Sequence, residues 1–195
     1  KGKSGHGARP HEGVDAIWVA SKVISGIQEL ITRQLDPLDP VVITFGKING
    51  GNAFNVLAEK VTLIGTVRCT NIKLFKNIGN WLDENISSLA NSCGADAKVI
   101  FREITPPVNN NIEINRVFRD SAVKVLGQDN VIELLKPSLG AEDFAEFLNE
   151  IPGAMFRLGV AGLEECAPLH SSKFNPDERA IAIGIKVITE SIVKL

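Results

Sequence analysis

Two helical stripes of apolar residues constrain the first hundred residues more strongly than any other feature of the sequence. Apolar side chains recur at intervals of three and four along residues 14–34 and again along residues 75–93, as on one buried face of an α-helix. The stripes consist of Ile17, Ala20, Ile24, Ile27 and Ile31, and of Phe75, Ile78, Leu82, Ile86, Leu89 and Cys93. Each helix is therefore expected to pack this face against another element.

Three further segments alternate apolar and polar side chains in the manner of β-strands. Residues 41–45 follow a proline-containing break, and residues 61–68 follow the turn-forming run Asn49-Gly50-Gly51-Asn52. Residues 97–101 come after the second helix and a glycine that can end it. Because successive side chains of a strand point to opposite faces, each segment is expected to bury one face.

The order helix, strand, strand, helix, strand predicts a ferredoxin-like βαββαβ fold for the first part, with residues 1–5 as the tail of a preceding strand. Pro106 and Pro107, followed by three asparagines, are stiff and then turn-prone. We therefore expect one domain at residues 1–106 and a second part at residues 107–195.

The second part is predicted to contain three helices and two short strands. The helices are expected at residues 114–126, 142–149 and 177–194, and the strands at residues 131–135 and 154–160. Two strands are few for an independent domain. This part is therefore expected to be the C-terminal portion of an α/β domain whose other strands lie upstream, and we expect the chain to begin inside a longer gene product.

Charge and cysteine content argue against several classes of function. The chain has 21 basic and 23 acidic side chains without a one-signed block, so nucleic acid is not an expected partner. No apolar run approaches the roughly 20 residues that cross a bilayer, so no membrane partner is expected either. Three widely spaced cysteines without a CxxC pair argue against a disulfide framework and favour a reducing compartment, the cytoplasm.

The three histidines are the first candidates for chemistry. His6 and His11 lie in an irregular segment rich in glycine and proline, from which a histidine can face a ligand, although a solvated loop histidine is equally expected. His170 also lies in a predicted loop and could bind a metal through a neutral ring nitrogen. Cys166 precedes it by four residues, but that pairing alone is a weak metal signal.

Two other groups of polar residues are candidates for a site. Glu142 and Asp143 follow Gly140 at the start of a predicted helix, where helix capping alone would explain them. Asn55 and Arg68 lie ahead of one predicted strand and at its end, and both could reach a common pocket. An arginine at a strand end is, however, usually just solvated.

Four segments together resemble one known family in order and spacing. They are Lys1-Gly2-Lys3-Ser4-Gly5-His6-Gly7-Ala8-Arg9-Pro10-His11, Gly50-Gly51-Asn52-Ala53-Phe54-Asn55-Val56, Gly140-Ala141-Glu142-Asp143-Phe144 and Leu169-His170-Ser171-Ser172-Lys173-Phe174. Over essentially its whole length the chain resembles the aminoacylase and glutamate carboxypeptidase family of metallopeptidases. It most resembles the branch of hippurate hydrolases, N-acyl amino acid amidohydrolases and indole-acetyl amino acid hydrolases. The resemblance implies a lid or dimerisation domain followed by the C-terminal part of a zinc-peptidase-like catalytic domain.

The resemblance also implies roles for five residues. His6 matches a lid histidine that reaches the partner subunit's active site and holds the scissile carbonyl oxygen. Asn55 and Arg68 match lid residues that bind the substrate carboxylate and acyl group. His170 matches the last metal ligand, and Glu142 lies in a segment that lines the metal site, where we count it among the catalytic residues. The metal implied is zinc, with manganese, cobalt or nickel as alternatives.

The activity implied is metal-dependent hydrolysis of the amide bond of N-acyl amino acids, such as hippurate-like or N-acetyl conjugates, by a homodimer formed through the lid. The other metal ligands and the glutamate general base of the family lie outside this chain. The 195 residues alone are therefore expected to be inactive. The alternative is a non-catalytic ferredoxin-like binding or dimerisation module. A metal-storage protein is disfavoured because dispersed histidines and cysteines give no closed ligand set.

Overall fold

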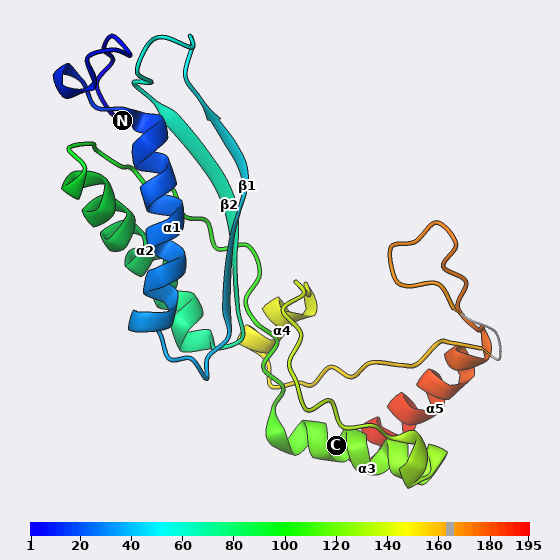
Figure 1. The fold of residues 1–195 in the computed structure, drawn as a ribbon. Helices are drawn as coiled ribbons and strands as arrows, with labels where there is room; N and C mark the ends of the chain where they lie inside the picture. Colours follow the sequence, from blue (N-terminus) through cyan, green and yellow to red (C-terminus); the bar gives the residue numbers. More distant parts are fainter. Residues whose placement is uncertain (163–165) are drawn as a thin grey trace. The chain divides into compact units, whose positions relative to one another are not determined.

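A computed structural model of the chain describes residues 1–162 and 166–195, which form two compact units (Figure 1). The first unit comprises Lys1–Pro107 together with Ser138–Ala141. The second unit comprises Val108–Pro137 and Glu142–Leu195. The four residues Ser138–Ala141 thus belong to the first unit although the chain on either side of them belongs to the second.

The first unit is built from two helices and one antiparallel hairpin. After a short 3-10 helix, η1 (Pro10–Glu12), come α1 (Ala16–Gln34), β1 (Val41–Gly50), β2 (Val61–Cys69) and α2 (Ile72–Ser92). The hairpin pairs Val41 with Cys69 at one end and Gly50 with Val61 at the other. A register shift between Phe45 and Lys47 places one extra residue, Gly46, in β1.

Side-chain caps fix where both long helices of the first unit begin. The Asp15 carboxylate accepts a hydrogen bond from the Ile17 amide at 2.9 Å at the start of α1. The Asn71 side chain accepts from the Lys73 amide at 2.8 Å at the start of α2, and its Nδ2 donates to Asp39 Oδ2 at 2.7 Å. These bonds satisfy amides that have no partner within the helix.

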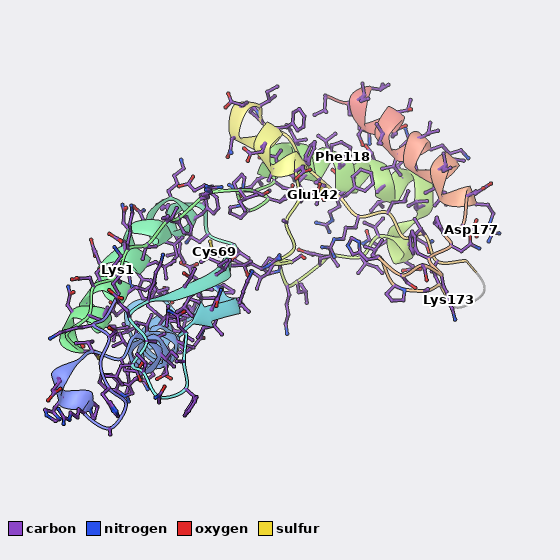
Figure 2. The ribbon with its side chains drawn as sticks, turned by 90° about the horizontal axis from the view of Figure 1, so that it is seen from above. Lys1, Cys69, Phe118, Glu142, Lys173 and Asp177 are labelled. Atoms are coloured by element: carbon purple, nitrogen blue, oxygen red, sulfur yellow. The ribbon has the colours of Figure 1, made fainter. Side chains whose placement is uncertain are left out.

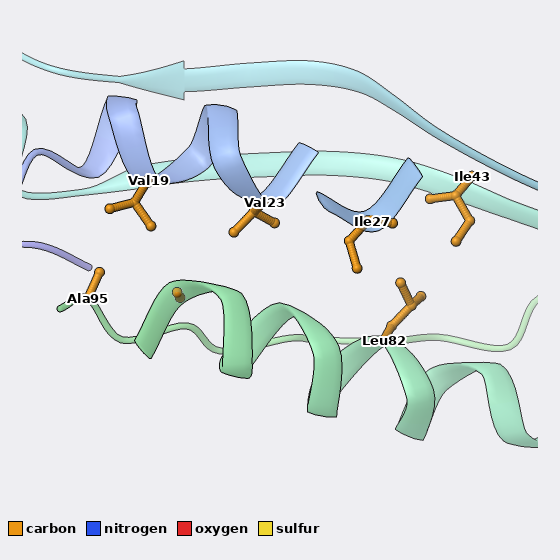
Figure 3. Close-up of a cluster of buried hydrophobic side chains, with 7 residues drawn as sticks. Val19, Val23, Ile27, Ile43, Leu82 and Ala95 are labelled. Carbon is orange, nitrogen blue, oxygen red and sulfur yellow. The ribbon is translucent and has the colours of Figure 1, made fainter. Parts of the chain in front are cut away.

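The core of the first unit lies where α1 packs on α2 and on the hairpin (Figure 3). Its buried members are Val19, Val23, Ile27, Ile43, Leu82, Ala90 and Ala95. The second predicted stripe is confirmed, since Ile78 and Leu82 are buried and its other members are half-buried. The first stripe is wrong at Ile17, which is 47% exposed. Apolar residues of α1 also lie beside the predicted stripe. Packing against α2 and the hairpin buries the face that carries Val19 and Val23 instead of Ile17.

The mixed α/β fold is confirmed, but the sheet contains only two of the strands that the sequence predicts. Residues 97–101 form no ladder, and residues 1–5 contribute only isolated pairs, such as the one between Lys3 and Val14. A ladder needs several consecutive pairs, whereas the Lys1 and Asp96 backbones exchange hydrogen bonds at a single position. Residues 97–101 nevertheless bury one face, as predicted, because Ala97 and Phe101 pack against the core.

The second unit consists of helices joined by extended chain. They are α3 (Ile112–Leu126), η2 (Gln128–Asn130), α4 (Phe144–Glu150) and α5 (Arg179–Ile192). The three α-helices lie close to the three predicted helices, whereas the short η2 was not predicted. The strands predicted at 131–135 and 154–160 are absent, because neither segment finds a pairing partner among the described residues. Side chains nevertheless pack, as the Phe118 and Phe156 rings lie 5.4 Å apart.

α5 has two apolar sides. Ala180, Gly184, Val187 and Ser191 are buried, and the helix packs on α3. Ile181, Ile185, Ile188 and Ile192 are exposed at 43–64%. None of the helices in the described part of the chain is both long and apolar enough to span a membrane.

Candidate functional site

The structure joins the histidine segment to the loop that follows β1. His6 pairs with Val56 in an isolated antiparallel bridge. The Gly7 amide donates to the Asn55 carbonyl at 2.9 Å, and the Leu57 amide donates to the Gly5 carbonyl at 2.8 Å. Residues His6 and Asn55, which are 49 positions apart in the sequence, therefore lie on adjacent backbones.

Gly7 allows this close approach. A Cβ built on Gly7 would lie 3.0 Å from the Asn55 carbonyl oxygen and 3.3 Å from its carbonyl carbon. These are backbone atoms, which cannot rotate away as a side chain could. The absence of a side chain at position 7 is thus what lets the two segments share a hydrogen bond.

The orientation of the His6 ring follows from one hydrogen bond. Its Nδ1 accepts from the Ala8 amide at 3.1 Å. A ring nitrogen that accepts carries no proton, so in the neutral imidazole the proton resides on Nε2. The side chain is exposed. His6 can therefore donate a hydrogen bond from Nε2–H to the carbonyl oxygen of a ligand that binds at this loop.

Arg68 lies near the end of the hairpin where Val41 pairs with Cys69, whereas Asn55 lies in the loop at the other end, between Gly50 and Val61. Seven steps along β2 separate Arg68 from Val61 and span about 23 Å at the usual rise of a strand. Arg68 Nη1 donates to the Leu139 carbonyl at 2.8 Å. The sequence placed Asn55 ahead of this strand and Arg68 at its end, and the full length of β2 runs between these two positions.

Glu142 lies immediately before α4 in the second unit (Figure 2). Its Oε1 is 3.4 Å from the Phe144 amide, a long hydrogen bond at the start of the helix. The carboxylate is exposed, as is that of Asp143. The geometry agrees with the capping role that the sequence left open and leaves the second carboxylate oxygen free for another partner.

His170 is the one non-glycine residue of the described chain with a left-handed backbone, at φ 67°. It occupies a turn in which the Ser171 amide donates to the Pro168 carbonyl at 3.1 Å. Such a conformation costs a non-glycine residue on the order of 1 kcal/mol or more, and it is over-represented at functional sites. The His170 side chain is exposed.

A metal ion is not held by the described residues alone. They contain no group of three or more histidine, cysteine, aspartate or glutamate side chains arranged to bind one. The Cys166 thiol instead lies against the backbone carbonyl of Asn175, at 3.5 Å. Residues 1–162 and 166–195 thus show no complete ligand set for a metal centre.

The shifted pKa values of the described residues lie outside the candidate residues. Hydrogen bonds from the Arg179 side chain, and then from its backbone amide, lower the pKa of Asp177 to about 2. Burial, and secondarily the charge of Asp39, raises the pKa of the Cys69 thiol. The first shift marks a carboxylate that accepts a hydrogen bond from the Arg179 amide at the start of α5, and the second marks a thiol that is harder to ionise.

Sequence reasoning proposed His6 and Arg68 as candidates but missed the groups that form hydrogen bonds with their side chains. The Ala8 amide and the Leu139 carbonyl are backbone atoms, and no residue type signals them. The proximity of Ala8 to His6 in the sequence was the only available signal for the first.

Comparison with known proteins places these features in a family. Residues 1–92 match the peptidase dimerisation domain of M20 proteins. The first 92 residues therefore form the dimerisation domain of the M20 peptidase family. The resemblance drawn from the four sequence segments is thereby confirmed.

Three relatives illustrate the match. "Probable hydrolase sll0100" of Synechocystis sp. is 39% identical over 191 residues, which are 97% of this chain and 49% of the relative. An N-acetyldiaminopimelate deacetylase of Bacillus cytotoxicus is 33% identical over 98% of this chain and 50% of its own length. "IAA-amino acid hydrolase ILR1-like 4" of Arabidopsis thaliana is 34% identical over 94% of this chain and 43% of its own length. The chain thus spans about half the length of the relatives that it matches.

Solved structures agree. An aminohydrolase from methicillin-resistant Staphylococcus aureus superposes with a TM-score of 0.84 at 29% identity, over 99% of this chain and 49% of that protein. The YXEP protein of Bacillus subtilis, described as a dinuclear metal binding peptidase of the M20 family, gives 0.72 at 24% identity, over 92% and 46%. At that identity the second comparison supports the fold alone.

Proposed function

We propose that the polypeptide to which this chain belongs is a metal-dependent hydrolase of the amide bond in N-acyl amino acids, and that the chain supplies part of its active site. Support for the reaction comes from relatives named as hydrolases, among them a deacetylase of an N-acetylated amino acid and a hydrolase of amino acid conjugates. The observation that carries the proposal is the backbone pairing of the His6 segment with the Asn55 loop.

His6 is proposed to hold the scissile carbonyl oxygen. Amide hydrolysis places negative charge on that oxygen, and a fixed N–H donor stabilises the charge as it develops. The Ala8 amide fixes the ring through Nδ1, so Nε2–H needs little reorganisation to serve as this donor. Asn55 lies in the loop whose backbone is bonded to Gly7. It is proposed to bind the same substrate molecule through its side-chain amide.

The other candidates are proposed to complete the site. Arg68 is proposed as a ligand of the substrate carboxylate, since Nη1 is bonded to Leu139 and the guanidinium carries further N–H donors. Glu142 is proposed to line the reaction centre with its second carboxylate oxygen. His170 is proposed as one ligand of a divalent metal, zinc or alternatively manganese, cobalt or nickel, whose other ligands lie outside this chain. The strained backbone of His170 supports that assignment.

The first unit is proposed to form a homodimer, because residues 1–92 match a dimerisation domain. In such a dimer His6 and Asn55 of one subunit would serve the metal site of the other. The exposure of both residues is compatible with this role.

Subunit mixing tests the proposal in the product of the complete open reading frame. His6→Ala and His170→Ala should each be inactive. If His6 acts across the dimer, random re-assortment makes half of the dimers mixed, and one of the two sites in each is intact. About a quarter of the wild-type activity should therefore return.

A matched control uses the pairing of the two loops. Mixing His6→Ala with Asn55→Ala should restore nothing, because both residues of one lid serve the same site and neither mixed site receives both. Recovery in this control would contradict the shared site. A wild-type protein without amidase activity on any N-acyl amino acid would instead favour the non-catalytic dimerisation module.

A further inference from the structure

The hydrogen bond between Arg68 and Leu139 joins residues 71 positions apart in the sequence. Residues 132–138, which lead to Leu139, are exposed throughout. The four residues Ser138–Ala141 nevertheless belong to the first unit. Because the chain that precedes this turn is exposed, little else holds the turn against the first unit. A specific contact is therefore needed to keep it there.

The arginine end of this contact is rigid. Arg68 pairs with Val42 in the β1–β2 register, so its backbone is fixed by the hairpin. Three residues later, the Asn71 side chain caps α2 and donates to Asp39 at 2.7 Å. The backbone on both sides of Arg68 is thus held by regular structure. Only the side chain, which ends in the guanidinium, is free to change its conformation.

The Leu139 end depends on the contact. The turn has one internal bond, from the Gly140 amide to the Ser138 hydroxyl at 3.1 Å. Leu139 is half-buried, whereas Ser138, Gly140 and Ala141 are exposed. A hydrogen bond from a charged donor to a carbonyl is stronger than a neutral one. Arg68 therefore contributes more to the placement of this turn than the turn does itself.

The turn leads directly into the candidate carboxylate. Glu142 is three residues beyond Leu139, so chain connectivity keeps the two Cα atoms within about 11 Å. Fixing the Leu139 carbonyl limits where the backbone of Glu142 can begin. An error of about 1 Å in the placement of a reacting group can reduce a rate a hundredfold.

We infer that Arg68 is a positioning residue whose guanidinium anchors the Ser138–Ala141 turn to the first unit and thereby restricts the backbone that leads into Glu142. This role is additional to the proposed contact with a substrate carboxylate and needs no substrate to be present. Its effect on turnover rests on the proposed function, but the anchoring itself does not.

Amide hydrogen exchange in the 195-residue chain, without substrate, tests the anchor. Arg68→Ala should accelerate exchange of the Gly140 amide, the bonded amide in the peptide that covers residues 138–143, by about tenfold, the factor expected for losing one charge-assisted hydrogen bond. Arg68→Lys, which keeps a donor, should recover part of the protection. Thr66→Ala, an exposed change two residues earlier on the same face of β2, should leave the peptide unchanged. Protection in α1 reports whether each variant remains folded.

A second measurement requires no variant. In the wild-type chain, nitrogen-detected NMR should show slowed rotation of the Arg68 guanidinium, since one Nη is bonded to Leu139. A freely rotating guanidinium, or exchange in residues 138–143 that is unaffected by Arg68→Ala in a folded chain, would overturn the anchor.

Kinetics of the complete gene product separate anchoring from substrate binding. With an N-acetyl amino acid and with its carboxamide, Arg68→Ala should lower kcat by about 10- to 100-fold. A defect confined to KM, and seen only with the free carboxylate, would mean that Arg68 acts on substrate alone. Wild-type protein that hydrolyses neither compound would defeat the proposed function while leaving the exchange result intact.

Discussion

Gly7→Ala tests the contact that joins the two loops of the candidate site. The new Cβ would lie 3.0 Å from the Asn55 carbonyl oxygen, whereas ordinary contacts begin near 3.4 Å. Relieving the clash moves the segments apart by about 0.4 Å and lengthens the 2.9 Å bond between the Gly7 amide and Asn55 to about 3.3 Å, beyond the usual range. The expected loss is about 0.5–1.5 kcal/mol of local stability.

The assay is amide exchange at Leu57, whose amide bonds the Gly5 carbonyl on the other side of the same bridge. Exchange should accelerate roughly two- to tenfold, as that loss of stability predicts. The matched control is Gly46→Ala, because a Cβ there meets nothing within 4 Å. Unchanged exchange at Leu57 in Gly7→Ala would refute the claim that this glycine is required for the pairing of the loops.

Two further predictions concern stability. Ile27→Ala empties a fully buried position of α1 and should destabilise the first unit by about 2–5 kcal/mol in urea unfolding, whereas Ile17→Ala, 47% exposed on the same helix, should cost about 0.5 kcal/mol or less. Asp177, whose pKa is lowered from 3.8 to about 2, supports α5 above pH 4, and this support should be lost as the pH falls from about 4 to 2. NMR titration of its carboxyl group would check the value, and Asp177→Asn should remove this pH dependence.

Helices were predictable from the sequence because their signals are local. The spacing of the apolar side chains around Leu82, for example, lies entirely within one helix. The face that α1 buries was predicted less well. Val19 and Val23 are buried although Ile17 fits an equally regular stripe, and only the position of α2 and the hairpin distinguishes the two.

Strands were less predictable, because pairing depends on distant chain. Residues 97–101 alternate as a strand should, and Phe101 is correctly placed against the core, yet no ladder forms among the described residues. The candidate site shows the same limit. The sequence identified His6 and Asn55 as residue types in suitable loops, whereas the bond that brings them together involves only backbone atoms.

The return of Ser138–Ala141 to the first unit bears on how such a protein can be rearranged in evolution. A contiguous domain can move between genes in a single recombination event. A segment ending at Pro107 would carry Arg68 away from the carbonyl that it bonds, and the gene that remained would keep Leu139 without its donor. If homologues exchange the first unit, the incoming arginine at position 68 must therefore be able to bond the turn at residues 138–141 of the recipient. These two distant stretches of sequence are thus expected to be inherited together.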